Sequence, residues 1–208
     1  MKKFDDQLLY NIPVIGILRN FSTEEIKWVT SLYYEAGFRT LEVTLNGNNA
    51  AASIEYLAKE LPDMNIGAGT VCNQEDLKVA QEAGASFIVS PICDIALIEK
   101  ALENKLAVFP GALTPSEIYT AWNAGATAVK LFPASSFGPA YLKELRAPLP
   151  QIKIIPVGGI SKSNLSFYFE VGAIGVGMGG GLFKREDITN KDRAKVLSHL
   201  KEVFNHLP

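Results

Sequence analysis

The chain has 208 residues, of which 48% are hydrophobic and 20% are charged, and its formal net charge at pH 7 is -2. This is the composition of a globular protein, and so small a charge gives no electrostatic reason to expect a nucleic acid or an anionic membrane as partner. No apolar stretch reaches the ~20 residues that span a bilayer, and residues 1–11 lack the apolar core of a signal peptide. Cys72 and Cys93 form no Cys-x-x-Cys motif, so we expect a cytoplasmic protein without a disulfide framework.

Short apolar runs alternate with helical segments along the whole chain. The predicted strands cover residues 14–18, 40–45, 65–69, 87–90, 107–110, 128–132, 153–157 and 174–178. Each is followed by a segment with apolar residues at three- and four-residue spacing, which is typical of an amphipathic helix. Eight such units predict an α/β fold in which residues 1–208 form one domain, a (β/α)8 TIM barrel. An open doubly wound sheet is the alternative, but it usually has fewer strands.

Helix boundaries support this division of the chain. Serine or threonine followed by acidic or polar residues is typical of a helix start, and it occurs at Ser22, Thr114 and Ser161. Glycine shortly before a predicted strand is typical of a helix end, and it occurs at Gly37, Gly84 and Gly125.

Two polar residues stand out because they interrupt apolar predicted strands. Side chains alternate between the two faces of a strand, so Lys130 lies opposite Val129 and Leu131, and Glu42 lies on the face opposite the leucines of its own run. If the apolar neighbours pack against helices, both charged groups point into the barrel. A buried lysine favours its neutral amine, which can attack a ketone, and a buried glutamate can act as general acid and base. The structural alternative is a salt bridge between them.

Further candidates lie where other predicted strands end, which is where barrel enzymes place their active sites. Arg19 closes the first strand, and its guanidinium can hold a substrate carboxylate. Thr70 ends the run GAGT and can bind a carboxylate through its hydroxyl. Taken alone, each of these two residues also fits an ordinary structural role.

Two glycine clusters follow the seventh and eighth strands. They include Gly158 and Gly159 in the first loop, and Gly179 and Gly180 in the second. These loops of a barrel frequently bind phosphate, because glycine allows successive backbone N–H groups to converge on an anion. Tight strand-to-helix turns are the structural alternative.

We predict no metal and no other cofactor. His199 and His206 both lie in the C-terminal helical tail, whereas catalytic metal sites usually recruit histidine from the working face of the fold. A magnesium site built from carboxylates alone remains formally open.

Taken together, these motifs resemble those of a known family. The runs LEVTL (41–45), GAGTV (67–71), SP (90–91), FPG (109–111), KLFPA (130–134) and GGIS (158–161) resemble the family of 2-keto-3-deoxy-6-phosphogluconate aldolases and 4-hydroxy-2-oxoglutarate aldolases. The resemblance implies a class I Schiff-base aldolase, usually a homotrimer, that cleaves a 2-keto-3-deoxy-6-phospho sugar acid to pyruvate and glyceraldehyde 3-phosphate.

The resemblance also implies roles for individual residues. Lys130 would form the Schiff base, Glu42 would be the general acid and base, and Thr70 would contact the pyruvyl carboxylate. Pro91 and Phe132 would line the pocket, while Gly158, Gly159, Gly179 and Gly180 would hold the phosphate.

Three departures from the family pattern bear on the substrate, and two of them, at Asn46 and Val157, look closer to phosphogalactonate enzymes. Asn46 occupies the place where phosphogluconate enzymes often carry arginine, so Arg19 would take over the carboxylate. Val157 stands where many phosphogluconate enzymes have a threonine, whose hydroxyl could distinguish the two configurations of the sugar at C4. A serine of the last phosphate turn is replaced by glycine, so the backbone alone would hold the phosphate.

Two other classes remain as alternatives. A sugar-phosphate isomerase or epimerase can share the barrel and its phosphate loops, but it would need a second base. A non-catalytic sugar-phosphate binding protein is the other alternative. It does not explain why Lys130 and Glu42 are both kept inside the barrel, where a buried charge costs free energy.

Overall fold

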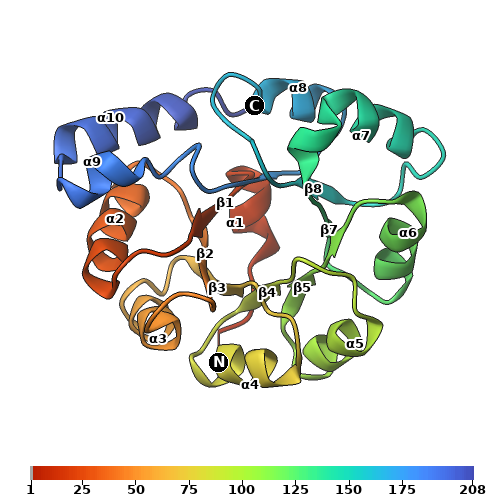
Figure 1. The fold of residues 1–208 in the computed structure, drawn as a ribbon, viewed down its shortest axis with the longest axis horizontal. Helices are drawn as coiled ribbons and strands as arrows, with labels where there is room; N and C mark the ends of the chain where they lie inside the picture. The colour runs from red at the N-terminus through yellow and green to blue at the C-terminus, as the bar shows by residue number, and fades with distance from the viewer. Residues whose placement is uncertain (1) are drawn as a thin grey trace.

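The computed structural model describes residues 2–208, which form a ring of strands surrounded by helices (Figure 1). The strands are β1 (Val14–Leu18), β2 (Thr40–Thr44), β3 (Asn65–Gly69), β4 (Phe87–Val89), β5 (Ala107–Phe109), β6 (Gly111–Ala112), β7 (Val129–Leu131), β8 (Ile154–Pro156) and β9 (Val176–Met178). The helices are α1 (Asp6–Asn11), α2 (Thr23–Glu35), α3 (Ala50–Glu60), α4 (Gln74–Glu82), α5 (Ile95–Glu103), α6 (Pro115–Asn123), the 3-10 turn η1 (Ala134–Ser136), α7 (Gly138–Arg146), α8 (Leu165–Glu170), α9 (Arg185–Thr189) and α10 (Arg193–Phe204).

The strands pair in parallel and close into a barrel. One sheet has the order β5-β4-β3-β2-β1-β9 and the other has the order β6-β7-β8. At one seam β5 and β6 are separated only by Pro110, and at the other Val157 pairs with Gly177. The two sheets therefore form one closed ring, and the fold is the (β/α)8 TIM barrel that the sequence predicts.

Every predicted strand run contains a strand, with one difference at the fifth. There the chain changes its pairing partner at Pro110: Phe109 pairs with β4, and Gly111 pairs with β7. Proline has no N–H to donate to either neighbour, so the fifth strand is divided into β5 and β6.

Most of the predicted helix signals are confirmed. Ser22 with Glu25, and Thr114 with Glu117, form capping boxes at the starts of α2 and α6. The glycines that follow α2, α4 and α6 have φ between 80° and 107°, the left-handed conformation expected at a helix end.

The helix predicted to open at Ser161 instead begins at Leu165. The Asn164 side chain accepts a hydrogen bond from the Ser161 N–H and donates one to the Gly159 carbonyl. These bonds fold residues 159–164 into a turn, and a short polar side chain that bonds to nearby backbone competes with helix formation in this way. The turn shapes the loop after β8.

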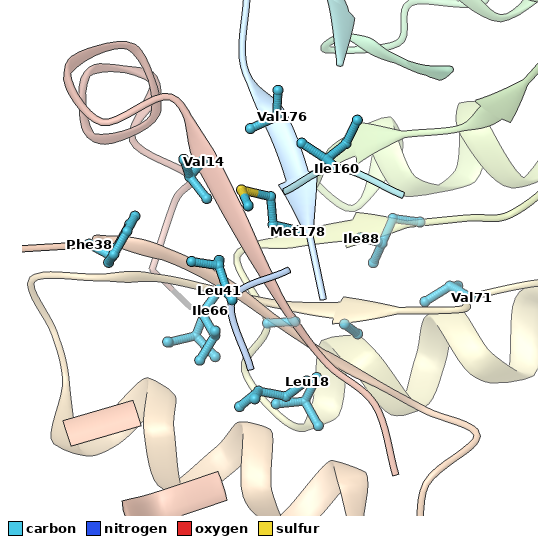
Figure 2. Packing of buried hydrophobic residues seen from close by; sticks show 14 of the residues in the cluster. Val14, Leu18, Phe38, Leu41, Ile66, Val71, Ile88, Ile160, Val176 and Met178 are labelled. Carbon is cyan, nitrogen blue, oxygen red and sulfur yellow. The ribbon is translucent and has the colours of Figure 1, made fainter. Parts of the chain in front are cut away.

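Apolar side chains pack in two layers, one outside and one inside the barrel. Figure 2 shows part of the outer layer, where strand residues such as Leu41, Ile66 and Met178 pack in the space between the strands and the helices. The inner layer consists of Leu9, Ile15, Ile17, Phe87, Val89, Phe109, Ala128, Ile155 and Val157. The interior of the barrel is therefore largely apolar, and the buried polar side chains include Glu42 and Lys130.

Helix α1 lies against the inner layer, at the end of the barrel where the strands begin. Leu9 belongs to the inner layer, and Phe4 contacts the rings of Phe87 and Phe109. Asn65, at the start of β3, exchanges two hydrogen bonds with the backbone of Asp5. The N-terminal segment thus closes this end, and the opposite end carries the loops that follow the strands.

Among residues 2–208, no helix has both the length and the apolar character needed to cross a bilayer.

Candidate active site

Lys130 and Glu42 lie inside the barrel, as the alternation of their strands predicts. The flanking Val129 and Leu131 belong to the outer apolar layer, whereas Lys130 lines a small interior cavity together with Glu42. The two side chains are 5% and 2% exposed, and the rest of the cavity wall is apolar or glycine. The cavity of about 10 Å³ has room for no more than about one water molecule, so the amine and the carboxyl group are shielded from bulk water.

The surroundings shift both groups toward their neutral forms. Burial raises the pKa of Glu42 to about 7, although Lys130 and Arg19 act in the opposite direction. Burial also lowers the pKa of Lys130, opposed by the nearby Glu42. A lysine with a lowered pKa supplies more neutral amine at neutral pH, and a carboxyl group that titrates near 7 can both give and take a proton.

Glycine at position 69 makes room for the Glu42 carboxylate. A Cβ at Gly69 would lie 2.5 Å from Glu42 Oε1, closer than any side chain tolerates. The other oxygen, Glu42 Oε2, is buried and has no hydrogen-bond partner within residues 2–208. An unpaired buried carboxylate oxygen costs free energy in the folded protein, which is typical of a group that works on a bound molecule.

A much larger cavity, of about 740 Å³, adjoins the small one at the ends of the strands. The two cavities share Ile17, Val157 and Gly177 in their walls. The predicted site residues that line the large cavity are Arg19, Phe132, Gly158, Gly159, Gly179 and Gly180. Lys130 Nζ lies 4.7 Å from the centroid of the Phe132 ring, so the amine is next to a side chain that lines the large cavity.

The large cavity is suited to anions. Among the described residues that line it, every charged one is basic: Arg19, Lys184 and Arg185. Within residues 2–208, the N–H groups of Gly159, Gly180 and Gly181 donate to no backbone or side-chain acceptor. A Cβ at Gly180 would meet nothing within 4 Å, so this part of the loop faces open space. Free N–H groups on glycine loops form the kind of concavity that binds phosphate.

Thr70 and Pro91 lie at the same end of the barrel but line neither cavity. Thr70 follows β3 with φ of 59°, a left-handed conformation that is strained for a β-branched residue. Pro91 follows β4 and is half-buried, with its carbonyl packed against Gly111.

Arg185, at the start of α9, is a site residue that sequence reasoning missed. Its Nη2 donates to the carbonyl oxygens of Arg19 and Asn20, at 3.1 and 2.6 Å, and its guanidinium lies 4.2 Å from the centroid of the Phe21 ring. These contacts fix the loop after β1, and with it the backbone of Arg19. In the sequence Arg185 stands in a charged run that resembles any solvent-exposed helix start.

The site therefore has two chemically different ends. At the buried end, an amine and a carboxyl group can form and break bonds at a carbonyl compound without bulk water. At the open end, basic side chains and glycine loops can hold anionic groups. Within residues 2–208, no three His, Cys, Asp or Glu side chains are grouped so as to hold a metal ion.

Comparisons with known proteins agree with this description. The family model described as KDPG and KHG aldolase matches residues 6–199. The chain is 36% identical to 2-dehydro-3-deoxy-6-phosphogalactonate aldolase of Escherichia coli K12, covering 83% of this chain and 85% of the relative. It is 38% identical to a 2-dehydro-3-deoxy-phosphogluconate aldolase of Pseudomonas aeruginosa, covering 77% and 72%.

A solved structure is similar over nearly the whole chain. It is the KDPG aldolase of Legionella pneumophila, with pyruvate captured at low pH as a covalent carbinolamine intermediate. Its TM-score is 0.88 at 28% identity, and the match covers 94% of this chain and 96% of that chain.

Proposed function

The chain belongs to the KDPG and KHG aldolase family of carbon–carbon lyases, and we propose that its Schiff-base lysine is Lys130 and its preferred substrate a 2-keto-3-deoxy-6-phosphogalactonate. It is thus a class I aldolase whose products are pyruvate and glyceraldehyde 3-phosphate. The observation that supports the assignment of Lys130 is its position: a buried lysine and a buried glutamate share a small cavity directly beside a large basic one.

The first half of the reaction forms an electron sink. The neutral Lys130 amine attacks C2 of the keto acid to give a carbinolamine, which loses water to form an iminium ion. The Glu42 carboxylate then takes the proton of the C4 hydroxyl while the C3–C4 bond breaks. The bonding electrons move onto the iminium nitrogen, so the aldehyde leaves and an enamine remains on Lys130.

The second half releases pyruvate. Glu42, now protonated, returns a proton to the C3 carbon of the enamine and regenerates the iminium ion. Water then adds to C2, and loss of the amine gives pyruvate and free Lys130. A carboxyl group whose pKa lies at about 7 suits this cycle, because it has to accept a proton and give it back in turn.

The phosphogalactonate preference rests on particular residues, since relatives of both substrate types are similarly identical to this chain. Val157 lines both cavities, so the sugar would meet methyl groups there instead of a hydroxyl. Arg19 lines the large cavity and its charge acts on both Glu42 and Lys130, so it lies near the reacting groups. An arginine in this position can hold the substrate carboxylate, the role that Asn46 cannot perform.

A cleavage assay with both C4 epimers tests the substrate assignment. Pyruvate release, coupled to lactate dehydrogenase, should give a higher kcat/KM with the phosphogalactonate than with the phosphogluconate. Val157→Thr should shift the ratio of the two kcat/KM values toward the phosphogluconate by about tenfold, the size of one hydrogen bond in a transition state. A wild-type preference for the phosphogluconate would refute the galactonate assignment but leave the aldolase reaction in place.

The pH dependence of kcat/KM should show the raised pKa of Glu42. Below pH about 7 the buried carboxyl group is protonated and cannot take the C4 hydroxyl proton, so activity should fall as pH falls through this value. A profile from pH 5.5 to 9 with the preferred substrate is the measurement. A profile that stays flat down to pH 5.5, as expected for a glutamate with the ordinary pKa of 4.5, would show that Glu42 is not the group that titrates.

The assembly that we propose is a homotrimer. Exposed apolar side chains lie on consecutive helical units: Ile92 and Ile95 at α5, Tyr119 in α6 and Phe137 before α7. Helices α5, α6 and α7 follow one another around the barrel (Figure 1). Such side chains gain free energy when a neighbouring subunit covers them. Light scattering during gel filtration, which gives the molar mass in solution, tests the proposal.

A further inference from the structure

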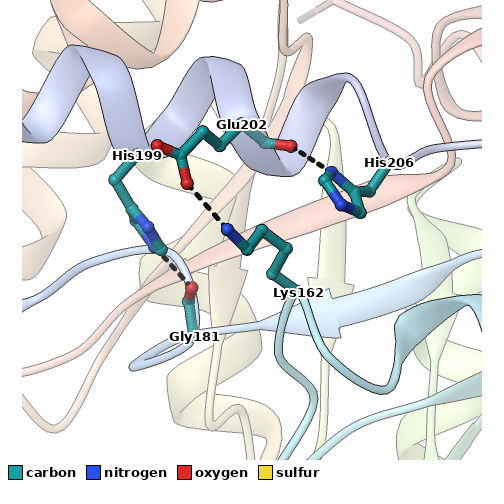
Figure 3. A network of polar contacts seen from close by, with 5 residues as sticks. All are labelled: Lys162, Gly181, His199, Glu202 and His206. Carbon is teal, nitrogen blue, oxygen red and sulfur yellow. Dashed lines mark hydrogen bonds and ion pairs between the residues drawn. The ribbon is translucent and has the colours of Figure 1, made fainter.

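Helix α10 contacts the backs of both glycine loops from outside the barrel (Figure 3). His199 Nε2 lies 2.9 Å from the Gly181 carbonyl oxygen in the loop after β9. A carbonyl oxygen can only accept, so Nε2 carries the proton and donates it. A half-buried side chain on the outer helix thus holds the backbone of a loop whose inner side lines the large cavity.

Gly181 is also the point at which the two glycine loops touch. A Cβ at this position would overlap with the carbonyl oxygen of Ile160, which belongs to the loop after β8. Any side chain here would push the loops apart. The hydrogen bond from His199 therefore fixes one residue that sets the separation of two loops.

A second contact links the same helix to the other loop. Glu202 lies three residues after His199, on the same face of α10, and its Oε2 is 2.7 Å from Lys162 Nζ. Lys162 lies two residues after Ile160. Because the carboxylate and the ammonium are both about half exposed, this ion pair by itself contributes little free energy to holding the loop. His199 makes the stronger link, and Glu202 adds a second point of attachment.

We propose that His199 is a positioning residue for anion binding, which holds the two glycine loops in the arrangement that binds a phosphate group. The proposal rests on the assignment of these loops to the substrate phosphate under the proposed function. His199 does not touch the substrate. It acts through the backbone of Gly181. To bind one anion, the N–H groups of Gly180 and Gly181 in one loop have to point at the same place as the N–H group of Gly159 in the other.

The expected effect is modest and confined to one end of the substrate. A neutral hydrogen bond contributes about 1 kcal/mol, so its loss should weaken phosphate binding by about fivefold. No residue of α10 lines the small cavity that holds Lys130 and Glu42, so imine formation with pyruvate should keep its rate. This difference separates a positioning role from a general effect on folding.

The test measures inorganic phosphate binding by ³¹P NMR titration, and pyruvate imine formation by borohydride trapping, in the same full-length proteins. His199→Leu removes the donor, whereas His199→Gln places an amide N–H near the position of Nε2. His206→Gln is the matched control, because among residues 2–208 the His206 side chain bonds only to its own helix end, at the Glu202 carbonyl. Should the leucine variant not fold, His199→Asn, whose amide is too short to reach Gly181, replaces it.

The expected result is a dissociation constant for phosphate that rises about fivefold in His199→Leu and returns to near wild type in His199→Gln, with pyruvate trapping unchanged in both. Unchanged phosphate binding in His199→Leu, or an equal loss of phosphate binding and pyruvate trapping, would overturn the proposal. Absence of pyruvate trapping in the wild type would instead refute the proposed function, and the phosphate titrations would still decide the role of His199.

Discussion

Replacing Lys130 with methionine should lower the rate of aldol cleavage by roughly 10⁴-fold or more, because among residues 2–208 no other lysine lines the small cavity, and the iminium ion has to accept the electrons of the C3–C4 bond. Methionine has a similar length and no charge. At pH 6, below the pKa of Glu42 at about 7, the variant leaves a neutral carboxyl group rather than an unpaired charge, so the melting temperature should not fall. Coupled pyruvate assays and thermal unfolding measure the two effects.

Lys153→Met is the matched control for that change. Lys153 precedes β8, is exposed and donates to the hydroxyl of Tyr10 on the outside of the site. Its variant should keep wild-type kcat and KM. If Lys130→Met retained activity within tenfold of wild type, another nucleophile would have to carry the reaction and the assignment of Lys130 would be wrong.

Glu42→Gln should lower kcat by about 10²- to 10⁴-fold while the imine with pyruvate still forms. Glutamine fills the same space beside Gly69 but cannot take the C4 hydroxyl proton. Lys130 keeps its amine, so the covalent step and the proton transfer are separated in this one variant. Steady-state cleavage and borohydride trapping are the two measurements, with the exposed Glu55→Gln as control. Normal turnover in Glu42→Gln would show that Glu42 is not the base.

The same variant should gain stability at alkaline pH. The pKa of Glu42 is about 7 in the folded protein and near its ordinary value of 4.5 in the unfolded chain. The folded state therefore binds the proton more tightly, so wild-type stability falls as pH rises from about 4.5 through 7. Glutamine has no such dependence. The gain should be on the order of 3 kcal/mol at pH 8 and absent at pH 4, measured by chemical denaturation.

The barrel and its buried pair could be predicted from the sequence because both follow from local periodicity. Alternation in the runs around residues 42 and 130 places one charged side chain on the inner face of each strand, and the closed ring then brings the two faces together. The glycine loops could be located for a similar reason, since they directly follow the last two strands. Family membership also decides against the isomerase and binding-protein alternatives.

The remaining features depend on contacts between segments far apart in the chain. Arg185 reaches the carbonyls of Arg19 and Asn20 across more than 160 positions, and no local pattern distinguishes it from a solvent-exposed arginine. His199 acts on Gly181 from an ordinary amphipathic helix. The turn at Asn164 depends on a choice between two sets of hydrogen bonds, and the sequence signal of a helix start does not reveal which set forms.

Borohydride trapping with pyruvate, followed by mass mapping of the modified residue, tests the central claim most directly. The protein is incubated with pyruvate, reduced, digested and compared with Lys130→Met treated in the same way. We predict one reduced pyruvate adduct, on Lys130, in the wild type and none in the variant. An adduct on another lysine, or no adduct in a folded wild-type protein, would contradict the account.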